Sequence, residues 1–67
     1  MNKTTIEYSI VYKHKGDKYF SAFVHPDAHD YDSIVSRAYE WAEHEDIEYI
    51  GVDKTTIFNE RCLVIKE

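Results

Sequence analysis

Hydrophobic and polar residues alternate toward both ends of the chain, while the middle follows a helical period. The alternation over residues 4–13 and again over 18–25, with many aromatic and β-branched side chains, is typical of half-buried β-strands. Between them lies Lys15-Gly16-Asp17, in which the glycine supplies the permissive backbone that a tight turn needs. Residues 4–25 are therefore predicted to form a β-hairpin.

Two registers of this hairpin are open. In the first, Ile10 faces Ala22 and Val24 joins the buried face; a slip of one residue places Phe23 opposite Ile10 and turns Val24 to the other face. We expect the first register, because it concentrates apolar side chains on one face. It leaves three apolar residues on the opposite, uncovered face: Val11, Tyr19 and Phe23.

The middle of the chain predicts one helix, which follows a loop over residues 25–29 that contains Pro26. Asp30 is the expected N-cap, and the helix is expected to end near residue 44. One arc is apolar and is expected to pack Ile34, Ala38, Trp41 and Ala42 against Tyr8, Ile10 and Val24. The opposite arc holds Asp32, Ser36, Glu40 and Glu43, with Tyr39 on the boundary.

Strand patterns return over residues 47–58 and 61–66, with Asn59-Glu60 as the expected turn and a bulge expected at Gly51 or Asp53-Lys54. The element order is therefore β-β-α-β-β, and a right-handed crossover places the third strand beside the first. We expect an α+β fold in a single domain, residues 1–67. It consists of a four-stranded antiparallel sheet in the order 2-1-3-4 with one helix packed on one face.

Charge is unevenly distributed along this chain. Residues 27–48 hold eight carboxylates and a single basic residue, Arg37, although the whole chain carries a net charge of only −5. Such a segment repels nucleic acid and anionic membranes and attracts basic surfaces. We therefore expect a protein partner with a basic surface.

Three interpretations of the acidic helix face are open: a solvated surface that only keeps the protein soluble, a protein-binding surface, or a mimic of the DNA backbone. One short helix offers barely one row of carboxylates, which disfavours the mimic. The functional hypothesis is a non-enzymatic module, such as a small acidic inhibitor or antitoxin-like accessory protein of phage or mobile-element origin, that occludes a basic surface of its target. The predicted partner-binding residues are Asp32, Tyr39, Glu40 and Glu43, with Tyr39 as the anchor.

A second class of function is open, in which the hairpin tip and the uncovered sheet face bind nucleic acid or a small ligand. Basic side chains would contact phosphates and aromatic rings would stack on bases. The residues would be Lys13, Lys15, Lys18, Tyr19 and Phe23. The acidic net charge argues against nucleic acid.

Catalytic and metal-binding patterns are missing from the sequence. There is no glycine-rich nucleotide motif and no serine-nucleophile motif, and Cys62 is expected to be an inert core thiol. Four potential metal ligands are close in sequence, but Pro26 prevents the helical spacing that zinc requires: His25, Asp27, His29 and Asp30. We expect no enzymatic activity, no cofactor and no metal.

The expected location is the cytoplasm. The segment MNKTTIEYSI lacks the apolar core of a signal peptide, no apolar run is long enough for a membrane span, and a single cysteine forms no internal disulfide. The uncovered sheet face also predicts self-association, so a homodimer or a partner-bound state is expected.

Overall fold

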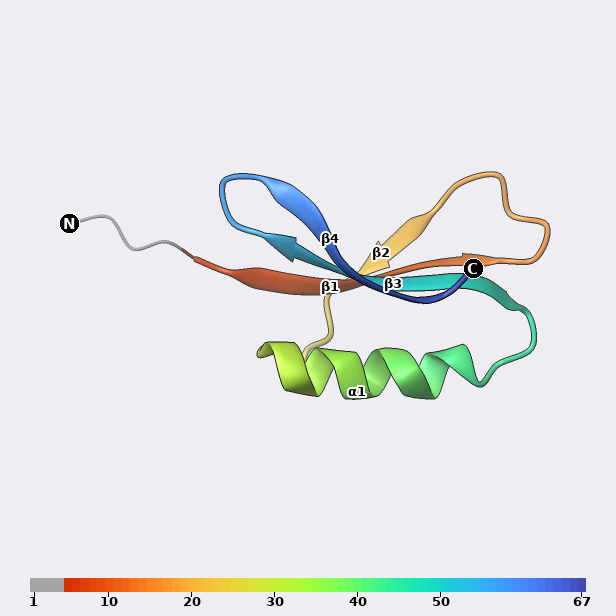
Figure 1. Ribbon diagram of the computed structural model, residues 1–67, viewed down its shortest axis with the longest axis horizontal. Helices are drawn as coiled ribbons and strands as arrows, with labels where there is room; N and C mark the ends of the chain where they lie inside the picture. The colour runs from red at the N-terminus through yellow and green to blue at the C-terminus, as the bar shows by residue number, and fades with distance from the viewer. Residues whose placement is uncertain (1–4) are drawn as a thin grey trace.

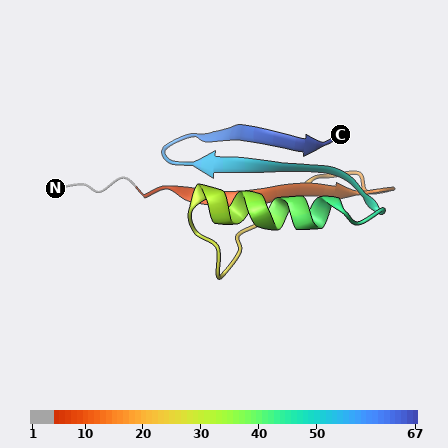
Figure 2. The ribbon, with the colours of Figure 1, turned by 60° about the horizontal axis from the view of Figure 1, so that its bottom comes forward.

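A computed structural model describes residues 5–67 and confirms the expected α+β architecture. The strands β1 (Glu7–His14), β2 (Ser21–Phe23), β3 (Ile47–Thr55) and β4 (Asn59–Lys66) form one antiparallel sheet in the order β2-β1-β3-β4. The helix α1 (Tyr31–Ala42) lies lengthwise along one face of this sheet (Figures 1 and 2). Thr4 of the predicted first strand, and the first residues of the segment examined for a signal peptide, lie outside the described part of the chain.

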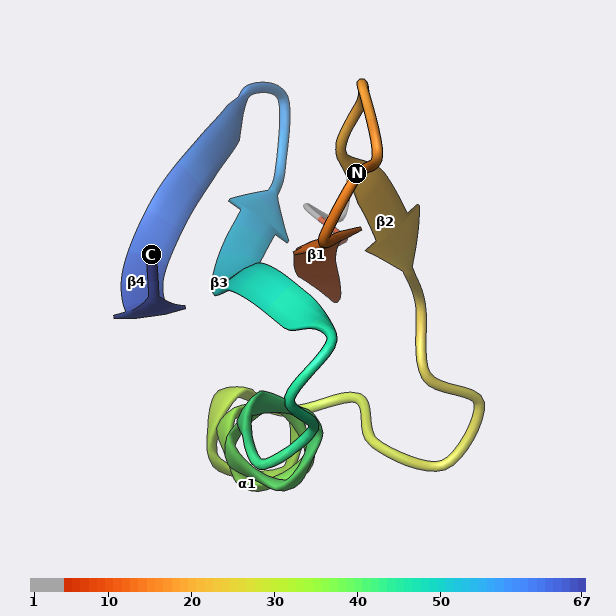
Figure 3. The same ribbon diagram turned by 90° about the vertical axis from the view of Figure 1, so that its right-hand side faces the viewer.

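The core lies between α1 and the two central strands. In the view along the strands, α1 sits below β1 and β3, with the edge strands β2 and β4 to either side (Figure 3). Ile10 of β1 pairs with Val52 of β3, and both side chains are fully buried. The complete buried cluster consists of Ile10, Ala28, Ile34, Ala38, Ile47, Ile50 and Val52. Burial of one stripe of α1 and one face of each central strand agrees with the periods in the sequence.

The helix begins at the predicted N-cap, Asp30, whose backbone is extended. The amide of Ile34 donates to the Asp30 carbonyl at 3.1 Å, which is the first helical hydrogen bond. The hydroxyl of Ser33 lowers the pKa of the exposed Asp30 carboxyl. At the other end, the ammonium of Lys66 donates to the carbonyls of Ala42 (3.3 Å) and His44 (3.1 Å). This contact supplies donors to the last turn of α1 and ties it to β4.

The register of the β1–β2 hairpin is the one that we did not expect. Ile10 pairs with Phe23, so Phe23 lies on the helix side of the sheet. Its ring packs against Trp41, with the ring centroids 5.2 Å apart, whereas Val24 is 48% exposed. The prediction was wrong because it compared the number of apolar residues on each face. The observed register instead buries the one β2 side chain that is large enough to reach Trp41.

The turn between β3 and β4 also differs from the prediction. It comprises residues 56–58 instead of Asn59-Glu60, and Thr55 pairs with Asn59 across the hairpin. The Asn59 amide donates to Asp53 at 2.9 Å, and its side-chain oxygen accepts from the Thr55 hydroxyl at 2.7 Å. These bonds hold Asn59 in the strand, so the turn moves to the residues before it. As a result, the apolar side chain of Ile57 is 86% exposed at the tip.

The ladder between β3 and β4 is irregular on both sides of Gly51. Register shifts occur between Ile50 and Gly51 and again between Val52 and Asp53, so both positions proposed from the sequence lie at an irregularity. The strands approach so closely at Gly51 that a Cβ atom there would lie 2.8 Å from the carbonyl oxygen of Leu63. Only glycine fits this approach without displacing backbone.

Candidate functional site

The acidic segment 27–48 extends from the loop before α1 to the first residues of β3, and all of its carboxylates are exposed. Two of them are paired: Glu40 with Arg37 at 3.4 Å, and Glu48 with Lys13 at 2.7 Å. The other six form no ion pair with any residue between 5 and 67: Asp27, Asp30, Asp32, Glu43, Glu45 and Asp46. The segment therefore presents uncompensated negative charge to solvent.

Two of the four predicted partner-binding residues, Asp32 and Tyr39, lie along one ridge of α1, and the C-cap residue Glu43 continues that ridge. Asp32, Tyr39 and Glu43 are separated by seven and four residues, which places them one above the other on a helix. Glu40 lies on the neighbouring ridge, where Arg37 balances part of its charge. Tyr39 is 55% exposed, so its ring is accessible between two carboxylates that have no basic partner in the described chain. We call Asp32, Tyr39, Glu40 and Glu43 the acidic helix surface.

The five residues of the alternative site do not share one surface. Phe23 packs against Trp41 on the helix side of the sheet, and Lys13 forms an ion pair with Glu48 of the acidic segment. The remaining three lie at the exposed tip of the β1–β2 hairpin: Lys15, Lys18 and Tyr19. A basic tip with one exposed ring remains, but Phe23 is missing from the predicted aromatic platform; the open face instead carries Phe20, which is 57% exposed and packs on Tyr49 with the ring centroids 4.9 Å apart.

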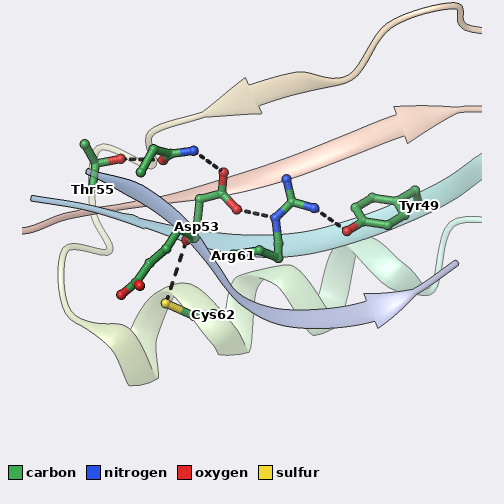
Figure 4. Close-up of polar contacts among 7 residues, drawn as sticks. Tyr49, Asp53, Thr55, Arg61 and Cys62 are labelled. Atoms are coloured by element: carbon green, nitrogen blue, oxygen red, sulfur yellow. Dashed lines mark hydrogen bonds and ion pairs between the residues drawn. The ribbon is translucent and has the colours of Figure 1, made fainter.

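The sheet face opposite α1 is covered by its own long side chains (Figure 4). The nearly buried carboxylate of Asp53 accepts hydrogen bonds from Arg61 and Asn59, and Arg61 also donates to the hydroxyl of Tyr49. The Arg61 guanidinium lies 5.4 Å from the centroid of the Tyr49 ring. Asp53 raises the pKa of Arg61, chiefly through their hydrogen bond, so the guanidinium stays ionised. The network covers the centre of a face that we expected to be bare.

This coverage removes the observation on which the expected homodimer depended. Val11, one of the three residues assigned to an exposed apolar patch, is only 5% exposed. Phe23 belongs to the other face, and Tyr19 lies at the hairpin tip. The centre of the open face therefore presents a polar network, with the exposed ring of Phe20 packed on Tyr49 beside it, and the three residues from which self-association was predicted do not form a patch there.

Cys62 is exposed, which corrects the expectation of a buried core thiol. It falls at the register shift between β3 and β4, so it is the extra residue of a bulge and does not follow the alternation of the strand. The imidazole Nδ1 of His25 accepts the amide of Asp27 at 3.0 Å, as part of the loop before α1. Among residues 5–67, no three His, Cys, Asp or Glu side chains converge on a metal-sized site.

A pocket of about 280 Å³ lies at the C-terminal end of α1, and sequence reasoning did not find it. Its lining comes from β1, α1, the loop after α1 and the start of β3: Tyr12, His14, Trp41, His44, Asp46 and Ile47. A signal was present, because residues two apart on a strand point to the same face, as do residues three apart on a helix. Tyr12 and His14 have the strand spacing, whereas His44 follows the end of α1 and its amide donates to the carbonyl of Trp41 at 3.1 Å. Only the tertiary fold brings these residues together.

Comparisons of the sequence with protein-family models, of the chain with curated proteins, and of the structure with solved structures find no match. Within residues 5–67, α1 is too short to cross a membrane. The features that bear on function are therefore the acidic helix surface, the hairpin tip, the open sheet face and the pocket.

Proposed function

We propose that this protein is a non-enzymatic binding module that attaches to a basic surface of another protein through its acidic helix surface. The observation that supports this proposal is the exposed ring of Tyr39 between Asp32 and Glu43, two exposed carboxylates without a basic partner in residues 5–67. A surface that only solvates a helix has no need of a half-exposed aromatic ring within its charged row. By covering a basic surface, such a module would act as an inhibitor or an antitoxin-like accessory protein.

The ring and the carboxylates have different roles in this proposal. Tyr39 supplies a large apolar area and a hydroxyl at a small conformational cost, which is the profile of an interface anchor. The exposed carboxylates remain hydrated and screened, so they mainly accelerate association and orient the partner. Binding should therefore weaken with salt through a slower association, while Tyr39 determines how long the complex lasts.

The alternative function, binding of nucleic acid or a small ligand by the hairpin tip, has one favourable observation. Lys15, Lys18 and Tyr19 are exposed together at the end of the β1–β2 hairpin, and Tyr19 is 80% exposed. Against it, Lys13 is paired with Glu48 and Phe23 faces the helix. The net charge of −5 also opposes a polyanion.

The test is a set of affinity captures from an extract of the organism that encodes the protein. Three baits are compared: the natural protein, a variant with Asp32, Glu40 and Glu43 replaced by lysine, and a control variant. The control replaces Glu7, Glu60 and Glu67, which are also exposed but lie outside the acidic segment, by lysine. Both variants change the net charge equally, so only the position of the change differs.

The proposal predicts that a protein captured by the natural bait is retained by the control variant and lost by the helix variant. The captured protein should carry a basic surface. Equal retention by both variants would contradict the acidic helix surface, and equal loss would show that net charge alone accounts for capture. A captured nucleic acid that depends on Lys15 and Lys18 would favour the alternative function.

A further inference from the structure

The pocket at the C-terminal end of α1 has walls of aromatic rings that meet at steep angles. The rings of Tyr12 and Trp41 are 5.1 Å apart between centroids and inclined at 74°, and those of Tyr12 and His14 are 5.5 Å apart and inclined at 88°. Ile47, which is 4% exposed, also belongs to the lining. The three aromatic side chains line the pocket, and the electron-rich faces of aromatic rings attract organic cations.

The charge of the pocket has the sign that a cation needs. Asp46 belongs to the lining, is exposed, and forms no ion pair with a residue between 5 and 67. Its backbone carbonyl accepts the amide of Lys15 at 2.8 Å, which fixes the loop that carries it.

Two basic side chains near the pocket are engaged elsewhere, whereas Lys15, whose amide contacts Asp46, forms no ion pair with a residue between 5 and 67. Lys66 donates to the carbonyls of Ala42 and His44 at the end of α1, and Lys13 pairs with Glu48. Neither belongs to the lining of the pocket. The pocket therefore combines aromatic walls and a carboxylate that forms no ion pair, and its described lining contains no lysine or arginine.

From this geometry we infer that the pocket binds an organic cation, namely the ammonium or guanidinium group of a lysine or arginine side chain of the partner. The inference deepens the proposed function and rests on it for the source of the cation. A volume of about 280 Å³ is small for a ligand pocket, since such pockets usually enclose ~300–1,000 Å³. It suits one inserted side chain. The aromatic faces attract the cationic head, and Asp46 supplies the opposite charge.

Trp41 is the only tryptophan, so its fluorescence and its indole N–H resonance report directly on this pocket. The natural protein is titrated with the amides of N-acetyl-arginine and N-acetyl-lysine, and with tetramethylammonium. The amide of N-acetyl-glutamine serves as a neutral probe and N-acetyl-glutamate as an anionic probe. The inference predicts a saturable change at Trp41 with the cations alone.

Two matched variants separate the pocket from the general field of the acidic segment. Asp46→Asn and Asp32→Asn each remove one exposed carboxylate, but only Asp46 lines the pocket. We expect Asp46→Asn to weaken arginine-amide binding by about three- to fivefold, and Asp32→Asn to change it by less than about half of that. Both spectra should show the natural fold.

Three outcomes would overturn the inference: no change at Trp41 with any cation, an equal response to glutamine or glutamate, or equal weakening by the two variants. None of these outcomes contradicts the proposed function if the capture experiments still show that binding is lost with the helix variant and kept with the control variant. Conversely, a cation response at Trp41 with captures that are insensitive to Asp32, Glu40 and Glu43 would reject the helix surface. It would retain the pocket as a cation site.

Discussion

Replacing Phe23 by alanine tests the observed strand register against the one that the sequence favoured. Removal of a fully buried phenylalanine costs ~3–5 kcal/mol of unfolding free energy. Phe23 is partly buried, so roughly half of that applies, and the ring contact with Trp41 at 5.2 Å adds ~0.5–1.5 kcal/mol. We therefore expect Phe23→Ala to cost ~2–4 kcal/mol, a large share of the roughly 3–10 kcal/mol typical of a domain this small.

The matched control for this substitution is Val24→Ala. Full burial of a valine is worth ~1.5 kcal/mol at the low end, and Val24 is 48% exposed, so its loss should cost less than ~1 kcal/mol. Urea unfolding, followed by far-ultraviolet circular dichroism with Trp41 fluorescence as a second probe, gives both values from the shift of the midpoint. If Val24→Ala proves as damaging as Phe23→Ala, the register that places Val24 in the core would be correct and the observed one refuted.

Three further substitutions test the sheet. Gly51→Ala should cost about 1–3 kcal/mol in thermal unfolding, because its Cβ would meet the carbonyl of Leu63 at 2.8 Å, and an unchanged melting temperature would contradict this close approach. Gly16→Ala meets no atom within 4 Å but has a φ of +90°, so it should cost only ~1 kcal/mol; a larger loss would indicate packing at that turn. Arg61→Ala leaves the nearly buried Asp53 carboxylate with one fewer hydrogen-bond donor and should cost about 1–2 kcal/mol of unfolding free energy, after allowance for the partial exposure of Arg61. Adding Asp53→Ala should restore part of this loss, whereas strictly additive losses from the two substitutions would argue against an interaction between the two side chains.

The element order and sheet order were predictable because they depend on periods that extend over many residues. The alternation in the first and last strands and the helical arc around Ile34 and Ala38 are robust to a change of one position. The crossover rule then leaves few ways to order the strands. The N-cap at Asp30 was predicted correctly for a different reason, because aspartate directly before an apolar helical arc is a preferred capping residue.

Features that depend on one residue or on distant partners were not predictable. The hairpin register depends on whether Phe23 or Val24 faces Trp41, a contact between segments far apart in the sequence. The position of the β3–β4 turn depends on the hydrogen bonds of Asn59, and the exposure of Cys62 depends on a bulge. Alternation alone contains none of this information.

The candidate site was likewise predictable only in part. Asp32, Tyr39 and Glu43 could be placed on one ridge from helical spacing alone. The pairing of Glu40 with Arg37 also fits helical spacing, because the two residues are three positions apart, but it was not part of the prediction. The pocket beside Trp41 needed the fold, because four separate segments contribute to its lining.

The central claim is that the partner binds the acidic helix surface and not the hairpin tip, and two exposed tyrosines distinguish these surfaces. Tyr39 is 55% exposed on α1, and Tyr19 is 80% exposed at the tip of the β1–β2 hairpin. The decisive measurement is the dissociation rate constant of the partner from Tyr39→Ala and from Tyr19→Ala, determined side by side by surface plasmon resonance. We predict that Tyr39→Ala accelerates dissociation by about tenfold or more, as expected for the loss of an anchor worth ~2 kcal/mol, while Tyr19→Ala leaves the rate unchanged. Faster dissociation from Tyr19→Ala with an unchanged rate for Tyr39→Ala would contradict the claim and move the binding site to the hairpin tip.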